Sequence, residues 1–473
     1  MDQMSHYTKP IFDMPSMYDL ALEPENEENE NRIGLDRYKK SLTFVRYALQ
    51  LEAIDDGWLY EQKGALLNQL QRYREAVDAF EQALQLGYAK DSWLYEQKIF
   101  ALINLKSYEE ALETCMEALV LPQPNEGWIY GQKGYILACQ GKYFEALKEY
   151  TRAVEYSSAD QGWIYGQRGH VLNRLKRYDE ALISFEKALT LGYKRGWVYG
   201  KVGLTLLRLE RYDEGLNAFE QALKRGYHAG GVIDWQYGYT LTSLRRFPEA
   251  LEAYQQALSL GHRGSFWIYV LKAHALNNLK MYSEALDALT EAFEHGCKSG
   301  WAYWLRGYAF INLKRYADAL SAFEEALGLN YKDSGNVYGQ RGYALLKLER
   351  YEEALSAFNS ALETDGANSG WLYAKKGYAL NQLKRYCEAL EAFEQALQAG
   401  YTEKGWVYGQ QGHALINIQH YNDALTAFES ALTLGYVNKG WTYGRKSYVL
   451  ANLQRHEESN EAQKIARTLG YYG

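Results

Sequence analysis

The chain has 473 residues, of which 47% are hydrophobic, and a formal net charge of -7 at pH 7. This acidic balance argues against a protein that coats nucleic acid, because such proteins usually carry a basic surface. No apolar stretch reaches the roughly 18 residues that a membrane-spanning helix needs, and the N-terminus lacks the features of a secretory signal, so we expect a cytoplasmic protein with no membrane contact.

The N-terminal part of the chain differs from the rest. Residues 1–35 contain the acidic run EPENEENENR, and such charge with little apolar content favours a disordered segment. Residues 36–56 follow, and we predict that they form a half-repeat that caps the start of the array. They keep the spacing of the second helix of each later repeat at Tyr38, Ser41, Val45 and Ala48.

From residue 57 onward the chain repeats itself every 34 or 35 residues, as in GWIYGQRGH at 162–170. A fixed period of this length is typical of a solenoid, in which each repeat contacts only its neighbours. We therefore predict one elongated array of about twelve repeats over residues 57–455. Two repeats have Val232 and Asn336 where the other ten have tryptophan: Trp58, Trp93, Trp128, Trp163, Trp197, Trp267, Trp301, Trp371, Trp406 and Trp441.

Each repeat is expected to hold two helices. In the repeat at 162–193 two series of apolar or small residues have helical spacing, first Tyr165, Gly169, Leu172 and Leu175, and then Ala181, Phe185, Ala188 and Leu191. The short connection makes the two helices antiparallel, and Gly192 ends the second. Basic pairs in the connection, such as Lys176 and Arg177, are expected to complement the negative end of the first helix.

A glycine lies inside the first helix of nine repeats, where it costs about 1 kcal/mol relative to alanine. We predict that the missing side chain lets an aromatic residue of the second helix pack closely, for example Phe185 against Gly169. Burial of one such ring contributes roughly 1.5 to 3 kcal/mol. The nine positions are Gly64, Gly134, Gly169, Gly203, Gly238, Gly307, Gly342, Gly377 and Gly412.

These residues together resemble the tetratricopeptide repeat. The resemblance rests on the separations of Tyr165, Gly169, Tyr178, Ala181, Phe185 and Ala188, which recur twelve times. It implies an all-α fold, a right-handed α-solenoid superhelix of helix-turn-helix repeats, whose inner wall is formed by the first helices. The chain departs from the family in its period of 35 and in the tyrosine that replaces the usual proline after the second helix, as at Tyr193.

A period of 35 is also found in pentatricopeptide repeats, which bind RNA. The usual end of that repeat, with a methionine-bearing helix, a lysine-glycine turn and a Pro-Asp pair, is absent here. The acidic charge of the chain also argues against RNA as a partner. RNA binding therefore remains a minor alternative.

We expect no enzyme activity, no metal and no cofactor, because no set of catalytic residues is found. The four cysteines, Cys115, Cys139, Cys297 and Cys387, lack metal-ligand spacing. Three histidines share one repeat position but lie in different repeats, whereas the ligands of a metal must converge. The loops GYKRGW and GYTEKGW lack the strand and the lysine of a phosphate-binding loop.

The expected binding surface is the inner wall of the superhelix, which carries columns of tryptophan, glutamine and tyrosine or histidine. Flat aromatic rings and amide groups suit a groove that holds a peptide. The partner-binding candidates are Trp163, Gln167, His170, Gln132, Tyr135, Gln340 and Tyr343. The tryptophans admit a second interpretation, in which they pack against the preceding Leu-Gly-Tyr turn between repeats.

Repeats six to eight break this pattern. Bulky apolar residues replace the usual glycine and glutamine there, and an exposed apolar patch often marks an interaction site. The candidates are Trp235, Tyr239, Val270, Leu271, His274, Trp304, Leu305 and Tyr308. Alternatively, these repeats tilt and bury the bulky side chains.

The sequence thus predicts a non-enzymatic scaffold that binds an extended segment of a partner protein in its concave groove. A second hypothesis is a regulatory subunit of a separate enzyme, in which the acidic N-terminal segment occupies the groove as an autoinhibitor. We expect residues 456–473 to form a capping helix with a polar outer face, through His456, Ser459, Asn460 and Gln463. The sequence identifies neither the partner nor the oligomeric state.

Overall fold

The computed structural model describes residues 43, 57–88, 92–156, 161–262, 265–329, 331, 333–364 and 369–472. Within these ranges all regular structure is helical, with 24 helices, so the all-α fold is confirmed. The sense of the superhelical twist stays a prediction. The N-terminal segment 1–35 and, apart from Thr43, the half-repeat at 36–56 lie outside the described residues.

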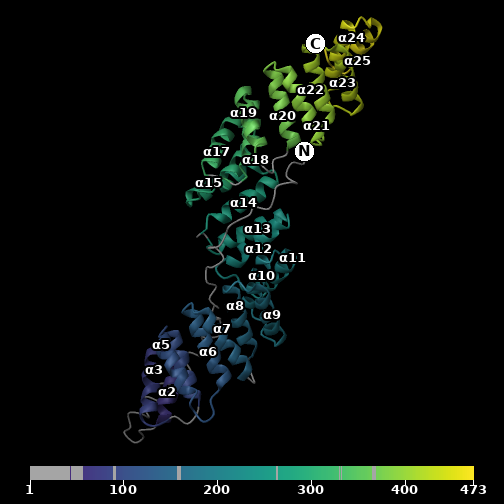
Figure 1. Cartoon of the computed structure of the whole chain (residues 1–473). Helices are drawn as coiled ribbons and strands as arrows, with labels where there is room; N and C mark the ends of the chain where they lie inside the picture. Colours follow the sequence, from purple (N-terminus) through teal and green to yellow (C-terminus); the bar gives the residue numbers. More distant parts are fainter. Residues whose placement is uncertain are drawn as a thin grey trace. The chain divides into compact units, whose positions relative to one another are not determined.

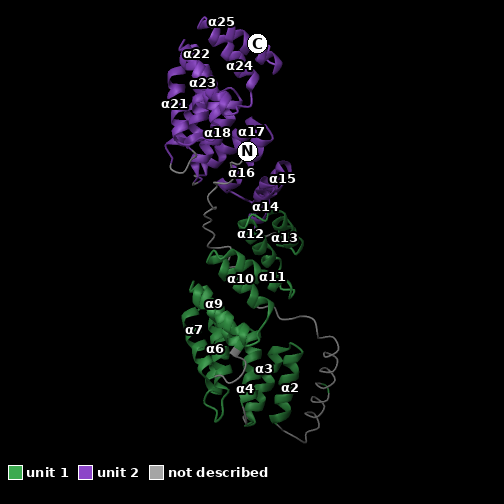
Figure 2. Ribbon diagram, turned by 90° about the vertical axis from the view of Figure 1, so that its right-hand side faces the viewer, with its two compact units in different colours: residues 1–262 green, residues 263–473 purple. Residues whose placement is uncertain are grey.

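The helices fall into two compact units, residues 1–262 and residues 263–473 (Figures 1 and 2). The helices of unit 1 are α2 (Gly57–Gln69), α3 (Tyr73–Gln85), α4 (Ser92–Asn104), α5 (Tyr108–Ala118), α6 (Glu126–Cys139), α7 (Tyr143–Tyr156), α8 (Gln161–Arg174), α9 (Tyr178–Thr190), α10 (Gly196–Arg208), α11 (Tyr212–Leu223), α12 (Val232–Ser243) and α13 (Phe247–Ser259). The helices of unit 2 are α14 (Trp267–Asn278), α15 (Tyr282–Glu294), α16 (Gly300–Asn312), α17 (Tyr316–Gly328), α18 (Ser334–Lys347), α19 (Tyr351–Leu362), α20 (Ser369–Gln382), α21 (Tyr386–Gln398), α22 (Lys404–Asn417), α23 (Tyr421–Thr433), α24 (Lys439–Asn452) and α25 (His456–Thr468).

Each repeat pairs an even-numbered first helix with the odd-numbered second helix that follows it. Within a unit, the second helix also packs against the first helix of the next repeat, so the repeats stack in chain order. The predicted helix pair of the repeat at 162–193 corresponds to α8 and α9. Its two apolar series supply buried residues on both helices, among them Leu172, Ala181 and Phe185.

The connection between α8 and α9 is a tight turn with a left-handed residue. Lys176 has φ 60°, and the N–H groups of Lys176 and Arg177 donate to the carbonyls of Asn173 and Leu172 at 3.0 and 2.9 Å. The Arg177 guanidinium then pairs with Glu180 in the first turn of α9, with Nε 2.6 Å from Oε1. The two basic residues therefore have different roles, one in the turn and one in an ion pair with the second helix. That they also complement the negative end of the first helix stays a prediction.

The close contact between glycine and aromatic residue is confirmed. A Cβ atom on Gly169 would lie 2.8 Å from Cδ1 of Phe185, and this ring is fully buried. The glycine therefore removes a clash that any other residue would create. The same arrangement occurs in nine repeats, as Gly64–Phe80, Gly134–Tyr150, Gly169–Phe185, Gly203–Phe219, Gly238–Tyr254, Gly307–Phe323, Gly342–Phe358, Gly377–Phe393 and Gly412–Phe428.

The three remaining repeats replace both partners together. At these two positions they have Ile99 with Cys115, Ala273 with Leu289, and Ser447 with Gln463. Wherever the first helix gains a side chain, the second helix loses its aromatic ring. In the last repeat a polar contact forms beside this position, since the Ser447 hydroxyl donates to the Ser459 carbonyl at 2.9 Å and the two hydroxyls lie 3.1 Å apart. The side chains at these two positions thus occupy the same space, so an aromatic ring on the second helix requires glycine on the first.

Candidate peptide-binding surface

The first helices carry the three predicted columns, one of tryptophan, one of glutamine, and one of tyrosine or histidine. We call the surface formed by these columns the first-helix surface. Most of its tryptophans serve the contact between repeats. A Cβ atom on Gly131 would lie 3.0 Å from Cζ3 of Trp163, so the indole of one repeat lies on the glycine of the repeat before it. The same contact joins Gly166 to Trp197, Gly339 to Trp371, and Gly409 to Trp441.

These contacts support the packing interpretation of the tryptophan column. Trp197 also meets Tyr193 of the preceding Leu-Gly-Tyr turn edge to face, with ring centroids 6.0 Å apart. Trp197, Trp301 and Trp371 are only 8, 7 and 9% exposed. The second glycine of GWIYGQRGH therefore leaves room for the indole of the next repeat to pack against the first helix.

The first two repeats depart from this arrangement. Trp58 and Trp93 are 48 and 38% exposed, and Phe100, on the same helix as Trp93, is 46% exposed. Glu61 takes the place of the glycine on which Trp93 would lie, and this carboxylic side chain is itself buried. The Trp93 indole is thus exposed in a pair of repeats that lacks this glycine.

The predicted apolar patch of repeats six to eight is not exposed, and this prediction is wrong. Its five bulky apolar members are each less than 5% exposed, namely Trp235, Val270, Leu271, Trp304 and Leu305. They stand at the two repeat positions where most other repeats have glycine and glutamine. The Trp235 indole stacks on His262 and the Trp304 indole on Tyr308, with centroids 5.5 and 5.7 Å apart. The alternative of internal burial is the one the structure supports.

The other predicted binding residues are partly or fully buried. Gln167 is buried, 4% exposed, and does not present its amide to solvent. The remaining candidates of the first-helix surface are partly buried, namely Gln132, Tyr135, Trp163, His170, Tyr239, His274, Tyr308, Gln340 and Tyr343. Whether they contact a partner stays a prediction.

In several repeats the residue ten positions after the tryptophan is an asparagine, and its structural role was not predicted. Its amide nitrogen donates a hydrogen bond to a backbone carbonyl in the first helix of the next repeat, 28 or 29 residues further along the chain. The three bonds are Asn68 to Gln97 at 2.9 Å, Asn277 to Leu305 at 3.1 Å, and Asn381 to Gln410 at 3.0 Å. The repeated position of the asparagine was the available signal, but its acceptor is a backbone atom that no residue pattern marks.

A group of basic side chains lies between α8 and α10. Lys201 is only 7% exposed, and burial, together with the nearby Arg174, lowers the pKa of its amino group to about 7. Burial also holds the pKa of His170 well below its usual value, with further contributions from Lys201 and Arg174. Arg174 is held by Tyr143, whose hydroxyl accepts from Nε at 3.1 Å. Of these residues, only His170 was predicted to bind a partner.

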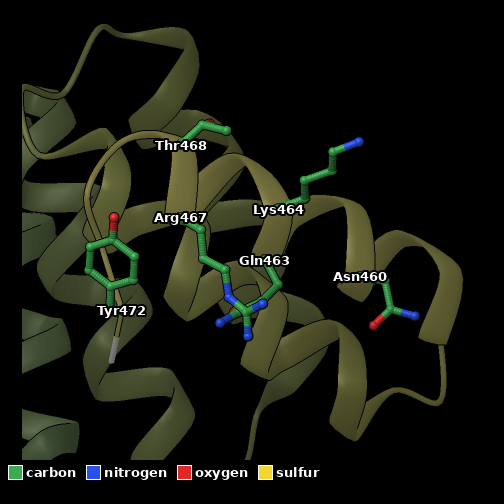
Figure 3. Close-up of a pocket in the computed structure, with 6 residues that line it drawn as sticks. All are labelled: Asn460, Gln463, Lys464, Arg467, Thr468 and Tyr472. Carbon is green, nitrogen blue, oxygen red and sulfur yellow. The ribbon is translucent and has the colours of Figure 1, made fainter.

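Two hollows lie outside the first-helix surface. One is on α25 and the residues that follow it, and is lined by Asn460, Gln463, Lys464, Arg467, Thr468 and Tyr472 (Figure 3). The other lies among α9, α10 and α11, where Tyr199, Val202 and Leu206 contribute apolar surface. Neither hollow contains a residue that was predicted to bind a partner.

In the described ranges no three His, Cys, Asp or Glu side chains gather as metal ligands. None of the helices described is both long and apolar enough to cross a membrane.

Several solved structures are similar to this chain over part or most of its length. Among solved structures, the APC/C hetero-tetramer Cut9-Hcn1 is 15% identical over 92% of this chain and 93% of its own, with a TM-score of 0.36. YrrB, a repeat protein described as having an unusual peptide-binding site, is 20% identical over 45% of this chain and 99% of its own, with a TM-score of 0.36. Yeast Tom70 is 14% identical over 88% of this chain and 92% of its own, with a TM-score of 0.33. No curated protein matches by sequence.

The sequence itself matches three family models, each described as the tetratricopeptide repeat. One matches residues 59–86, a second matches 125–194 and 160–226, and a third matches 203–265, 270–336 and 340–402. Together these segments cover more than half of the chain, and they overlap helices α2, α3 and α6 to α21. The chain therefore belongs to the tetratricopeptide repeat family.

Proposed function

We propose that the chain is a non-enzymatic scaffold that binds an extended segment of another protein on its first-helix surface. The observation that carries this proposal is the exposure of Trp58, Trp93 and Phe100 at 48, 38 and 46%. Equivalent tryptophans such as Trp371 are buried in contacts between repeats, so the fold does not require exposed rings at this position. Exposed aromatic side chains are frequent anchors of protein interfaces.

The surroundings of these rings suit a peptide. Glu96 lies one turn after Trp93 and accepts hydrogen bonds from Ser92 and Asn125 at 3.1 and 3.2 Å. The partly buried Gln97 follows on the same helix. Aromatic area beside carboxylate and amide groups can hold an apolar side chain and the backbone polar groups of an extended segment.

Affinity capture from the native cell lysate, followed by quantitative mass spectrometry, tests the proposal. The double variant Trp93→Ala/Phe100→Ala should recover at least about tenfold less partner than the unaltered chain, because truncation of aromatic anchors commonly costs that much affinity. Phe144→Ala is the matched control, since Phe144 is 74% exposed but lies on the second helix α7. If both variants capture the same proteins in the same amounts as the unaltered chain, the first-helix surface of these repeats is not the binding site.

A regulatory role remains the second candidate function. In it, the acidic segment 1–35 occupies the first-helix surface of its own chain until a partner displaces it. The partly buried cation Arg174 on the first helix α8 favours this possibility, because it adds positive charge beside that surface. Removal of residues 1–35 should then increase the affinity for the captured partner, and an unchanged affinity would argue against self-occupation.

A further inference from the structure

A hollow of about 470 Å³ lies among α9, α10 and α11 in unit 1. Its wall is apolar where Leu182, Leu206 and Ala218, one residue from each helix, pack together and are only 6, 5 and 6% exposed. Val202 of α10 packs against this cluster and also lines the hollow. A side chain that enters the hollow therefore meets an apolar wall.

The exposed rim of the hollow is acidic. The carboxylates of Glu186, Asp213 and Glu214 line it, together with the guanidinium of Arg211. Arg211 donates from Nε and Nη2 to the two carboxylate oxygens of Glu214 at 2.7 and 2.6 Å, and it also interacts electrostatically with Glu186. The side chains that line the hollow thus carry two more negative charges than positive charges, which favours a cation as the ligand.

Other repeats place a cation of their own at the equivalent position. The residue five positions after the tryptophan position is lysine or arginine in nine of the twelve repeats, and it is Val202 in the fifth. Among the described residues, three of these cations pair with the acid of the preceding second helix that is equivalent to Glu186. The pairs are Lys98–Glu81 at 3.4 Å, Arg341–Glu324 at 3.7 Å and Lys446–Glu429 at 2.9 Å. A basic side chain is thus the usual occupant of this place in the fold.

Val202 removes this cation from the fifth repeat, whereas the acid remains. The short side chain of Val202 carries no charge that could neutralise Glu186, and both residues line the hollow. Tyr237, at the same position of the next repeat, still provides a polar contact, since its hydroxyl donates to Glu220 at 3.5 Å. The hollow between Val202 and Glu186 therefore lies where a longer, basic side chain runs at other repeat boundaries.

We propose that this hollow binds a lysine or arginine side chain that belongs to a segment of another protein. The methylene stem of that side chain packs along Val202 and the apolar wall, and its charged end pairs with Glu186. The ligand thus supplies the group that Lys98 supplies to Glu81 within the chain. This inference goes beyond the proposed function, because it adds a second interaction surface, on the second helices α9 and α11, for a basic partner segment.

The test selects ligands from a library of random short peptides displayed on phage. The library is first depleted on Val202→Lys, because a lysine at this position should fill the hollow and pair with Glu186. Peptides that then bind the unaltered chain should carry a lysine or an arginine. The most enriched peptide is synthesised with a fluorescein label, and its affinity for each full-length variant is measured by fluorescence anisotropy at physiological ionic strength.

Two variants, Val202→Lys and Glu186→Lys, should weaken the binding of this peptide at least about tenfold, since like charges placed against each other across an interface are costly. Glu81→Lys is the matched control, because it makes the same charge change at the same position three repeats earlier. It should change the affinity less than about twofold, since salt screens exposed charges away from the binding site. A peptide with glutamine in place of its basic residues should bind the unaltered chain at least about threefold more weakly.

The proposal is overturned if no selected peptide distinguishes the unaltered chain from Val202→Lys, if the selected peptides lack basic residues, or if Glu81→Lys loses as much affinity as Glu186→Lys. Self-association of the unaltered chain that Val202→Lys abolishes, measured by static light scattering, would assign the hollow to a second copy and also contradict a partner segment. Glu186→Lys changes an exposed side chain, so the result does not depend on the folding of Val202→Lys. Trp93→Ala/Phe100→Ala should bind the peptide as the unaltered chain does, so the two proposals can fail separately.

Discussion

Helix propensity and core packing have opposite effects on the stability of a substitution at Gly169. Replacement of this glycine by alanine should gain about 1 kcal/mol of helix propensity. However, the new Cβ atom would lie 2.8 Å from the buried Phe185 ring, and forcing extra volume into a packed core costs about 1–3 kcal/mol. We expect Gly169→Ala to be destabilising by up to about 2 kcal/mol, measured from hydrogen exchange of the α8 and α9 amides.

Gly328 provides the control for this prediction. It ends α17, and a Cβ atom there would have no neighbour within 4 Å, so Gly328→Ala should be neutral or stabilising by roughly 0.5–1 kcal/mol. The combination Gly169→Ala/Phe185→Leu should recover part of the loss, because the chain already pairs Ala273 with Leu289. If Gly169→Ala and Gly328→Ala behave alike, the ring contact is not what makes glycine necessary.

Lys201 gives a prediction about pH. Burial lowers the pKa of its amino group from 10.5 to about 7. Between these values the unfolded chain binds a proton that the folded chain does not, so the free energy of unfolding should rise with pH above 7. The rise is at most about 1.4 kcal/mol per pH unit. Hydrogen exchange of the α10 amides at pH 7 and 9, corrected for intrinsic rates, measures it.

The matched variant for this pH dependence is Lys201→Met, which cannot bind the proton and should lack the rise. Below pH 7 both states of the unaltered chain hold the proton, so the contribution of Lys201 becomes independent of pH. The comparison ends at pH 9 because the phenol of Tyr239, whose pKa is raised by burial to about 12, adds an opposite dependence in more alkaline solution. Identical pH profiles for the two chains would show that the folded lysine keeps its proton.

At the scale of the helix, the hydrogen bond between repeats is open to a direct test. Asn381→Ala removes the donor to the Gln410 carbonyl at a position that is only 3% exposed, and a buried polar group left unpaired costs about 1–3 kcal/mol. We expect faster hydrogen exchange in α20 and α22. Asn417→Ala is the control, because Asn417 is exposed and donates to His413 of its own helix. Equal effects of the two variants would contradict a role for Asn381 between repeats.

The helices could be predicted from the sequence because their apolar spacing is local. Gly169 and Phe185 are 16 residues apart, and the contact between them follows once two antiparallel helices are expected. The burial of Trp235 and Leu305 could not be predicted in this way, because it depends on which side chains neighbouring first helices leave out. The left-handed turn residue Lys176 was also missed, since its conformation is imposed by the helix pair and not by its own preference.

At the scale of the whole molecule, α25 (His456–Thr468) is the second helix of the twelfth repeat. Among its described residues α25 buries only Ala462 and Ala466, while His456 and Asn460 are exposed where other repeats have tyrosine and leucine. Ser459 is not part of that polar outer surface as expected, because it bonds Ser447 of α24. The polar cap itself stays a prediction.

Removal of residues 456–473 tests this cap. The deletion would uncover α24, whose Val449 and Leu450 are 0 and 1% exposed, and an exposed apolar patch promotes association. We expect static light scattering to report at least about twice the mass of the full chain, since a repeat array needs a polar end to stay soluble. A shortened chain that scatters as a monomer, if the full chain does so, would show that α25 is dispensable for solubility.

The paired replacements of glycine and aromatic ring also bear on how such a chain avoids misassembly. Nine first helices are nearly interchangeable, so during folding one could dock on the second helix of a distant repeat. Ile99 would collide with a foreign phenylalanine, and Leu289 would leave a void beside a foreign glycine. These exceptions fall in the second, seventh and twelfth repeats, five repeats apart. We expect these exceptions to disfavour incorrect helix pairings, because a shift by fewer than five repeats would always place mismatched side chains against each other.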